Sequence, residues 1–172
     1  MDSLLAIAYL TTLVTILGIL GWLVLRQIYK NRKLEAVITD LQPKLQKAKG
    51  QPEEYYKLGS VYLSKKLYVK AISEFEKSLK AGGEDMAEVH NAMGFAYFCQ
   101  QQYDLAVKKY KQAIDLQPEY VTAINNLGHV YEKKKLVPQA LDAYQQVLAI
   151  APDNETAKRR AESLKKRVAN AD

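Results

Sequence analysis

The chain has 172 residues, of which 48% are hydrophobic and 26% charged, and its formal net charge is +6. Its single cysteine excludes an internal disulfide and a zinc site built from cysteines. The basic residues belong to no nucleic-acid-binding motif, so the positive charge does not indicate a nucleic-acid partner.

An uncharged apolar run occupies residues 4–25, close to the N-terminus. A helix needs about 20 apolar residues to cross a bilayer. A cleaved signal peptide would have a basic start and a shorter apolar stretch, whereas this chain begins Met1-Asp2-Ser3. We therefore predict an uncleaved transmembrane anchor over residues 1–25.

Basic residues flank the C-terminal end of this run and are missing from its N-terminal side. They are Arg26, Lys30, Arg32 and Lys33. Lysine and arginine accumulate on the cytoplasmic side of membrane-spanning helices. We expect the rest of the chain on the cytoplasmic side, or on its equivalent inside an organelle. Anionic headgroups attract such clusters, so membrane lipid is an expected partner of the anchor and its basic flank.

Residues 26–51 are predicted to form a basic amphipathic linker helix. Apolar residues recur in it at helical spacing: Leu34, Val37, Ile38, Leu41 and Leu45. Pro43 would kink or restart the helix. Two roles stay open for this apolar face. It could cap the segment that follows, or it could offer a surface to a partner helix.

A short motif recurs three times after the linker, with an interval of about 34 residues. The copies are Leu58-Gly59-x-x-Tyr62, Met93-Gly94-x-x-Tyr97 and Leu127-Gly128-x-x-Tyr131. An alanine and then an aromatic residue follow each glycine at fixed spacing. These are Ala71 with Phe75, Ala106 with Tyr110, and Ala140 with Tyr144. A period of this length is typical of a solenoid that binds a partner rather than of an enzyme.

Each copy predicts two antiparallel helices that pack closely. Glycine inside a helix costs about 1 kcal/mol relative to alanine, so these glycines indicate that a second helix passes too close for a side chain. The alanines are the small residues of that second helix, and the aromatic residues fill wider parts of the interface. Pro118 and Pro152 end two of the second helices, and Gly83 occupies the corresponding place in the first copy.

The last segment, 155–172, is predicted to form a basic capping helix. The stretch Pro152-Asp153-Asn154 supplies a helix stop and an N-cap before it. One face of the helix is apolar, with Ala157, Ala161, Leu164 and Val168. The other face is basic, and the terminal unit of a solenoid needs such a polar outer face to stay soluble.

The predicted fold class is therefore all-α. It comprises an N-terminal transmembrane helix, a linker helix, a three-repeat solenoid and a C-terminal capping helix. The repeats occupy residues 52–154, divided into units 52–86, 87–120 and 121–154.

Residues that could carry catalysis form no recognisable set. His90 and His129 occupy different helix positions without a nearby ligand motif, and paired acids such as Glu53-Glu54 stand at helix starts, where they stabilise the helix dipole. We expect no enzymatic activity, no metal, no cofactor and no small-molecule substrate.

The repeats resemble the tetratricopeptide repeat at nearly all of its signature positions. The resemblance implies a concave groove, lined by the first helix of each unit, that binds a protein partner. The residues it places in the groove are Tyr56, Ser60, Leu63, Asn91, Phe95, Phe98, Asn125, Asn126 and His129. Two alternatives stay open: Phe95 and Phe98 could be covered by neighbouring units or the linker, and the lysine-rich turns between helices could be the contact surface.

Chaperone-binding members of the repeat family hold a C-terminal carboxylate with a clamp of lysine, arginine and asparagine. None of the five corresponding positions of this chain carries the residue that the clamp requires. They hold Tyr56, Ser60, Ala92, Thr122 and Asn126, the last of which stands where the clamp has arginine. The resemblance therefore does not extend to binding of chaperone C-termini.

The order of anchor, basic linker, three repeats and short basic cap resembles a family of thylakoid-anchored proteins from cyanobacteria and algal plastids. Members of that family help photosystem I to assemble. The resemblance implies a single-pass thylakoid protein with its repeats on the cytoplasmic or stromal side. Its partner would be a photosystem I subunit or assembly intermediate. The alternative is an anchored docking receptor for precursor or envelope proteins.

Overall fold

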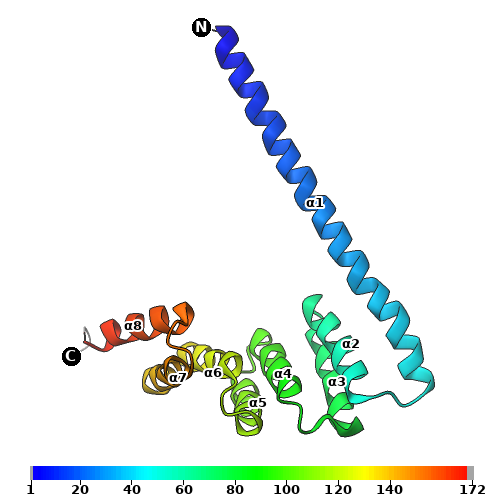
Figure 1. The fold of residues 1–172 in the computed structure, drawn as a ribbon, viewed down its shortest axis with the longest axis vertical. Coiled ribbons are helices and arrows are strands. Elements are labelled where there is room, and N and C mark those ends of the chain that lie inside the picture. The colour runs from blue at the N-terminus through cyan, green and yellow to red at the C-terminus, as the bar shows by residue number, and fades with distance from the viewer. Residues whose placement is uncertain (1, 170–172) are drawn as a thin grey trace. The chain divides into compact units, whose positions relative to one another are not determined.

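The computed structural model describes residues 2–169, and it describes the side chains of all of these except residues 2, 3, 6, 168 and 169. Every regular element in the described part is a helix (Figure 1). The chain divides into two compact units, Met1–Pro43 and Lys44–Asp172. This confirms the all-α class predicted from the sequence.

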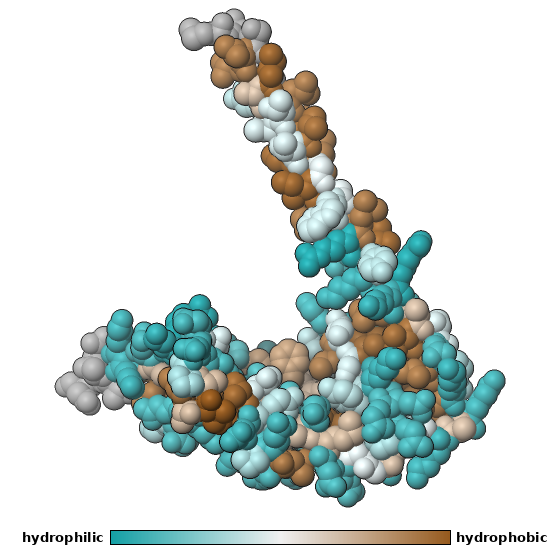
Figure 2. Space-filling view, viewed as in Figure 1, coloured by the Kyte–Doolittle hydropathy of each residue, from teal (hydrophilic) through white to brown (hydrophobic). Residues whose placement is uncertain are grey.

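The first unit consists of most of helix α1, Asp2–Lys47, which continues through Pro43. The expected anchor and linker are thus joined in this one helix, which ends at Lys47, four residues before the expected end of the linker. Among the described residues, α1 is the one helix long and apolar enough to cross a membrane, judged by length and composition. Its large apolar side chains between Leu4 and Tyr29 are exposed. Figure 2 shows that apolar residues dominate the N-terminal part of α1.

The second unit is a row of helical hairpins that ends in a single helix. The first pair is α2 (Pro52–Ser64) with α3 (Tyr68–Ser78), the second is α4 (Ala87–Cys99) with α5 (Tyr103–Leu116), and the third is α6 (Val121–Lys133) with α7 (Val137–Ile150). Helix α8, Glu155–Ala169, follows. Each helix packs on its neighbours in the chain, which is the arrangement expected of a solenoid.

The repeated glycines lie where an aromatic ring crosses the first helix of each pair. A Cβ atom added to Gly94 would lie 2.7 Å from the ring of Tyr110. The rings of Phe75 and Tyr144 cover Gly59 and Gly128 in the same way. The sequence pattern predicted the close approach correctly. However, we expected the alanines at the narrowest point of the interface and the rings in wider places. The structure shows instead that the rings occupy the space that a side chain on each glycine would fill.

The first pair ends differently from the other two. A short element, η1 (Leu79–Gly83), continues α3, and Gly82 within it has a φ of 110°. This left-handed conformation favours glycine. The buried Ser78 hydroxyl donates to the carbonyl of Pro52, at 2.8 Å. These contacts close the first pair without the proline that ends α5 and α7.

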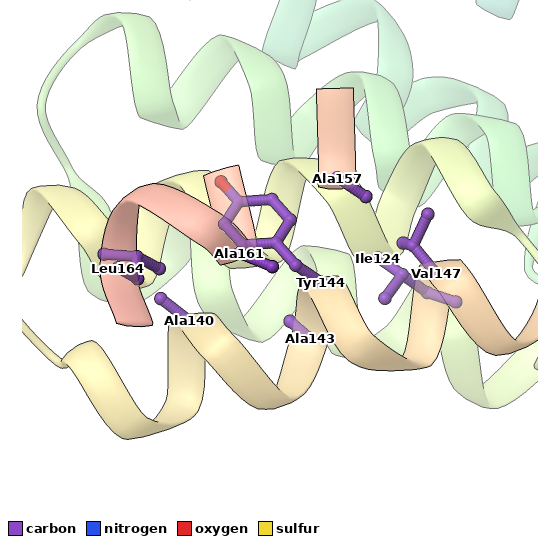
Figure 3. Close-up of a cluster of buried hydrophobic side chains, with 8 residues drawn as sticks. All are labelled: Ile124, Ala140, Ala143, Tyr144, Val147, Ala157, Ala161 and Leu164. Carbon is purple, nitrogen blue, oxygen red and sulfur yellow. The ribbon is translucent and has the colours of Figure 1, made fainter. Parts of the chain in front are cut away.

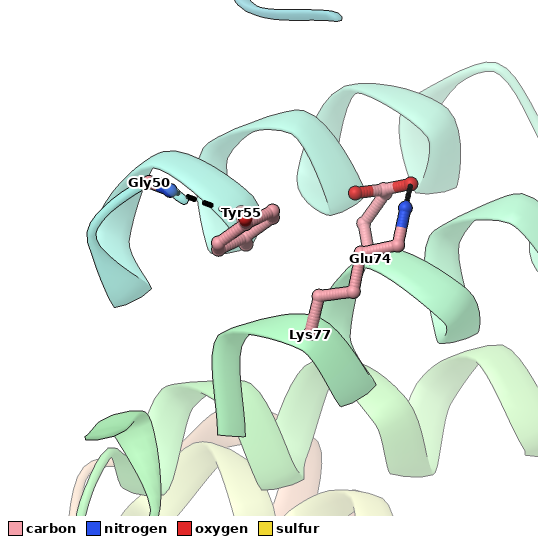
Figure 4. A network of polar contacts seen from close by, with 4 residues as sticks. All are labelled: Gly50, Tyr55, Glu74 and Lys77. Carbon is pink, nitrogen blue, oxygen red and sulfur yellow. Dashed lines mark hydrogen bonds and ion pairs between the residues drawn. The ribbon is translucent and has the colours of Figure 1, made fainter. Parts of the chain in front are cut away.

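The start of α2 is held by side chains as well as by backbone. The backbone N–H of Gly50 donates to the Tyr55 hydroxyl, at 3.1 Å, and that of Gln51 donates to the Glu54 carboxylate, at 2.9 Å. Figure 4 shows the contact between Gly50 and Tyr55, together with the ion pair of Lys77 and Glu74, at 2.7 Å, on α3.

Helix α8 covers the apolar end of the third pair. Its three described apolar side chains pack against α6 and α7 (Figure 3). The cluster consists of Ile124, Ala140, Ala143, Tyr144, Val147, Ala157, Ala161 and Leu164. The Asn154 side chain accepts a hydrogen bond from the Ala157 N–H, at 2.9 Å, as expected of an N-cap. The side chain of Val168, which we expected on the same face, lies outside the described residues.

Candidate protein-binding groove

A chain of hydrogen bonds joins the second and third helix pairs within the expected groove. The Asn126 side-chain amide donates to the Asn91 side-chain oxygen, at 3.1 Å. The Asn91 amide in turn donates to the Tyr120 hydroxyl, at 3.4 Å. The structure thus brings together two predicted groove residues and adds Tyr120, which the sequence did not predict. We call Asn91, Tyr120 and Asn126 the amide ladder.

The surroundings of Tyr120 shift the pKa of its hydroxyl. Burial, followed by the nearby charge of Glu88 and by Tyr56, raises the pKa of its hydroxyl, and its hydrogen bond with Asn91 acts in the opposite direction. Tyr120 stands immediately before α6, outside the helix positions from which the groove residues were chosen. Helix periodicity could not identify Tyr120, because the residue lies outside the helices. A tyrosine in the short loop that leads into a groove helix is the feature of the sequence that could have pointed to it.

The aromatic residues of the groove differ in how far they are covered. Phe95 is 42% exposed. Phe98 is partly buried, and its ring lies 4.9 Å from the His129 ring and 5.8 Å from the Tyr103 ring, measured between centroids. The third helix pair therefore covers part of Phe98 through His129. Of the two phenylalanines, Phe95 is the one that presents an open apolar surface.

The remaining predicted residues are half-buried along the first helices of the pairs. Tyr56 packs on Phe75 with the ring centroids 5.9 Å apart. Ser60 and Leu63 follow on the same helix, α2. Asn125 lies beside the amide ladder in sequence, and its side-chain oxygen is buried without a hydrogen-bond partner. Because this oxygen is buried, it is not open to a ligand in this structure.

An ion-pair network stands where the groove approaches the cap. The Tyr144 hydroxyl donates to one Glu132 oxygen, at 2.6 Å, and Arg160 of α8 reaches the other, at 3.4 Å. Burial and the Glu132 carboxylate raise the pKa of Tyr144. Burial, followed by Arg160, lowers the pKa of His129. Both carboxylate oxygens of Glu132 therefore make contacts within the protein.

His90 lies beside a pocket that shares no lining residue with the amide ladder. It is buried, and its Nε2 lies 3.2 Å from the carbonyl oxygen of Glu84. This pocket of about 440 Å³ is lined by residues of η1, α4 and α5. Its polar lining includes Lys109 and Gln112.

The groove offers hydrogen bonds and apolar contact, which are means of recognition. In the part of the chain that the structure describes, no group of three or more His, Cys, Asp or Glu residues could hold a metal ion. The amides of the ladder can hydrogen-bond an extended backbone, and Phe95 can pack against an apolar side chain.

Comparison with known families places the tetratricopeptide repeat over each of the helix pairs. Residues 55–81 and 121–154 match the tetratricopeptide repeat, and residues 94–135 match a related TPR repeat. The first two of these ranges fall on the first and third hairpins, and residues 94–135 extend from within α4 to the turn after α6.

Two plant and algal relatives are similar over most of the chain. The chloroplastic tetratricopeptide repeat domain-containing protein PYG7 of Arabidopsis thaliana is 36% identical over 94% of this chain, which spans 55% of that relative. The ycf37 protein of Cyanophora paradoxa is 36% identical over 84% of this chain and 86% of its own length. The chain thus spans about half of the plant relative and most of the algal one.

Solved structures share the fold at low sequence identity. MamA is similar with a TM-score of 0.76 at 23% identity, over 81% of each chain. The first TPR domain of RPAP3, solved with the HSP90 peptide SRMEEVD, has a TM-score of 0.66 at 20% identity, over 71% of this chain and 96% of that one. At this level of identity, the similarity establishes the fold alone.

Proposed function

Because this chain belongs to the ycf37 family of tetratricopeptide-repeat proteins, we propose that it is a non-enzymatic, membrane-anchored scaffold. It binds a protein partner and assists the assembly or stability of photosystem I at the thylakoid membrane. The observation that carries the proposal is similarity to plastid and chloroplastic proteins over nearly the whole chain, apolar helix and repeats together.

The groove supports the choice of a protein partner. The amides of Asn91 and Asn126 keep donor and acceptor capacity beyond the hydrogen bond that joins them, so they can bind an extended backbone. Phe95 offers apolar surface. The groove positions Tyr56, Ser60 and Thr122 carry none of the positive charge that a terminal carboxylate would require. The proposed partner is therefore an internal segment of a photosystem I subunit or intermediate rather than an acidic C-terminus.

The proposed topology follows from the charges that flank the apolar run. Residues 1–25 act as the anchor, and the linker from 26 to 51 leads to the repeats on the cytoplasmic or stromal side. The repeats, 52–154, and the basic cap, 155–172, then stand beside the membrane. The apolar face of the linker either caps the repeats or meets a partner helix.

The alternative function is that of an anchored docking receptor for precursor or envelope proteins. Such a receptor would use the same groove, but it would bind a short peptide that works in isolation. An assembly factor binds a folded, membrane-embedded subunit and copurifies with an incomplete complex. The two functions are therefore separated by what accompanies the protein after mild extraction.

We propose to tag the full chain in thylakoid-containing cells, extract it in mild detergent and identify the copurifying proteins. Subunits of an incomplete photosystem I complex are expected. Precursor proteins in their place would favour the receptor, and the absence of both would contradict the proposed function.

A matched pair of variants tests whether the groove is the contact. Asn91→Ala with Phe95→Ala removes the centre of the groove, and loss of such anchors costs about 2 kcal/mol or more, roughly thirtyfold in affinity. Lys111→Ala with Gln145→Ala changes exposed positions on the second helices instead and should copurify like wild type. Equal recovery by both variants would move the contact away from the groove. Circular dichroism should show native helix content in each.

A further inference from the structure

The two long edges of the helical row carry opposite charge. We define the turn edge as the turns within the hairpins and the starts of the helices that follow, residues 64–70, 99–105 and 133–139. Its charged residues are Lys65, Lys66, Lys70, Asp104, Lys133, Lys134 and Lys135. We define the loop edge as the loops between hairpins, residues 81–86, 117–120 and 151–154. Its charged residues are Glu84, Asp85, Glu119 and Asp153.

The turn edge is one continuous surface rather than separate turns. A surface depression joins Lys66–Lys70 to Gln100 of the next pair, and another joins 101–105 to Lys134 of the third. Asp104 pairs with Lys134 across the second and third pairs. The lysines at 66, 70, 133 and 135 are exposed, so positive charge is displayed in the first and third turns. The middle turn contributes one charged residue, Asp104, which is paired with Lys134.

The same backbone turn is repeated in all three hairpins. Lys66, Gln101 and Lys135 have φ values of 60°, 61° and 60°. The residue after each of them donates its N–H to the carbonyl of the tyrosine five positions earlier, at 2.9–3.0 Å. Glycine is the residue that this left-handed position favours. Two of the three positions hold lysine, at a cost in backbone strain that glycine would avoid.

Exposed apolar side chains lie among these lysines. Val69 is 73% exposed, Leu67 is 40% exposed and Leu105 is 45% exposed. Val69 and Leu67 line the same depression as Lys66 and Lys70. A surface that mixes lysine with exposed aliphatic side chains is suited to the headgroup region of an anionic bilayer, where lysine meets lipid charge and the aliphatic groups enter the acyl boundary.

We propose that the turn edge docks on an anionic lipid surface. The acidic loop edge is repelled by the same surface, so the charge separation orients the helical row with its turns toward the lipid. An acidic protein is the competing occupant, but such a partner gives no reason for exposed aliphatic side chains beside the lysines. The inference rests on the proposed membrane location of the chain and is independent of what the groove binds.

The test uses the full chain in vesicles of phosphatidylcholine, with or without phosphatidylglycerol. In a Cys99→Ser background, an environment-sensitive fluorophore is attached at Val69→Cys or Leu105→Cys on the turn edge. Glu119→Cys on the loop edge is the matched control. Flotation of the vesicles first shows whether the chain is incorporated. A chain that does not float with the vesicles would contradict the proposed membrane location. A chain that floats but shows no difference between the edges would contradict the docking proposal alone.

With phosphatidylglycerol present, lipid-borne quenchers should quench the label at 69 and at 105 at least threefold more than the label at 119. High salt should abolish the difference because it screens the attraction. Reversing the charges with Lys66→Glu, Lys70→Glu, Lys133→Glu and Lys135→Glu should abolish it too, while helix content stays native. Equal quenching at the two edges, or an equal difference in phosphatidylcholine alone, would overturn the proposal. Crosslinking from residue 69 to an acidic protein in thylakoid membranes, together with no lipid quenching in the vesicles, would assign the edge to that protein.

Discussion

At Gly94, the space that a side chain would occupy is filled by the ring of Tyr110, which is almost completely buried. A Cβ there would lie 2.7 Å from a ring carbon, closer than packed atoms come. We predict that Gly94→Ala lowers the free energy of unfolding of residues 44–172, the compact repeat unit, by about 1–3 kcal/mol. This loss occurs although alanine is the better helix former. Urea denaturation measures it.

Combining Gly94→Ala with Tyr110→Leu tests whether the Tyr110 ring causes the loss of stability. In a Tyr110→Leu background, the methyl group of Gly94→Ala has room, so the two changes together should cost less than the sum of the single changes. An unchanged cost of Gly94→Ala in that background would mean that some other contact, and not Tyr110, excludes the side chain.

His90 is expected to make the folded protein less stable as the pH falls. Burial lowers its pKa in the folded state, the Glu84 carbonyl opposes this effect, and Lys109 adds to it. A histidine with a lowered pKa is neutral when folded and binds its proton more readily when unfolded. Stability is therefore fully present above the unfolded pKa, about 6.5, and is lost as the pH falls below that value.

We predict that His90→Ile weakens this acid sensitivity. Isoleucine is a reasonable substitute because Ile124 occupies the corresponding, fully buried place in the third pair. The urea midpoint of residues 44–172 should fall less between pH 7.5 and pH 5.5 in the variant than in wild type. His129→Gln serves as a comparison, because burial lowers the pKa of His129 as well. An identical fall in wild type and His90→Ile would contradict the prediction.

At the scale of the element, the cap is a structural part of the third helix pair. Leu164 of α8 is almost completely buried against α6 and α7. We predict that Leu164→Ala destabilises residues 44–172 by about 2–5 kcal/mol, as large-to-small changes in cores do. The neighbouring Ser163→Ala, at an exposed position, should be nearly neutral. Equal stability of both variants would show that α8 is dispensable.

The sequence predicted the helical hairpins well because glycine, alanine and aromatic spacing recurs with the repeat. It could not predict which atoms meet at the glycines, since that depends on the direction in which a ring such as Tyr110 turns. The groove was harder to predict than the hairpins. The contact between Asn91 and Asn126 depends on how one pair is rotated on the next, which no periodicity within a helix specifies.

Two further residues show why the site was only partly predicted. Tyr120 enters the groove from a loop, so a choice restricted to helix positions omits it. Glu132 lies on α6, the helix that carries three of the predicted groove residues, yet its carboxylate is held by Tyr144 and Arg160. Whether a polar residue is open or already occupied depends on contacts between elements that are distant in sequence.

At the scale of the whole molecule, the chain combines an apolar helix with a module for protein recognition. Relatives share both parts, since the similarity to ycf37 of Guillardia theta covers 91% of this chain and 90% of its own length. Under the proposed function, this combination holds the recognition surface at one membrane face. The topology is therefore the property on which the proposed function depends most directly.

We predict that carbonate or high salt does not release the protein from thylakoids, because an apolar helix rather than surface charge holds it. Protease added to the outer, cytoplasm-facing side of sealed thylakoids should degrade the repeats, because Arg26, Lys30, Arg32 and Lys33 place the following residues on that side. A lumenal protein, protected until detergent is added, controls for intact membranes. Release by carbonate would contradict the anchor, and protection of the repeats would reverse the orientation. With the repeats in the lumen, the groove could meet only the lumenal parts of a photosystem subunit.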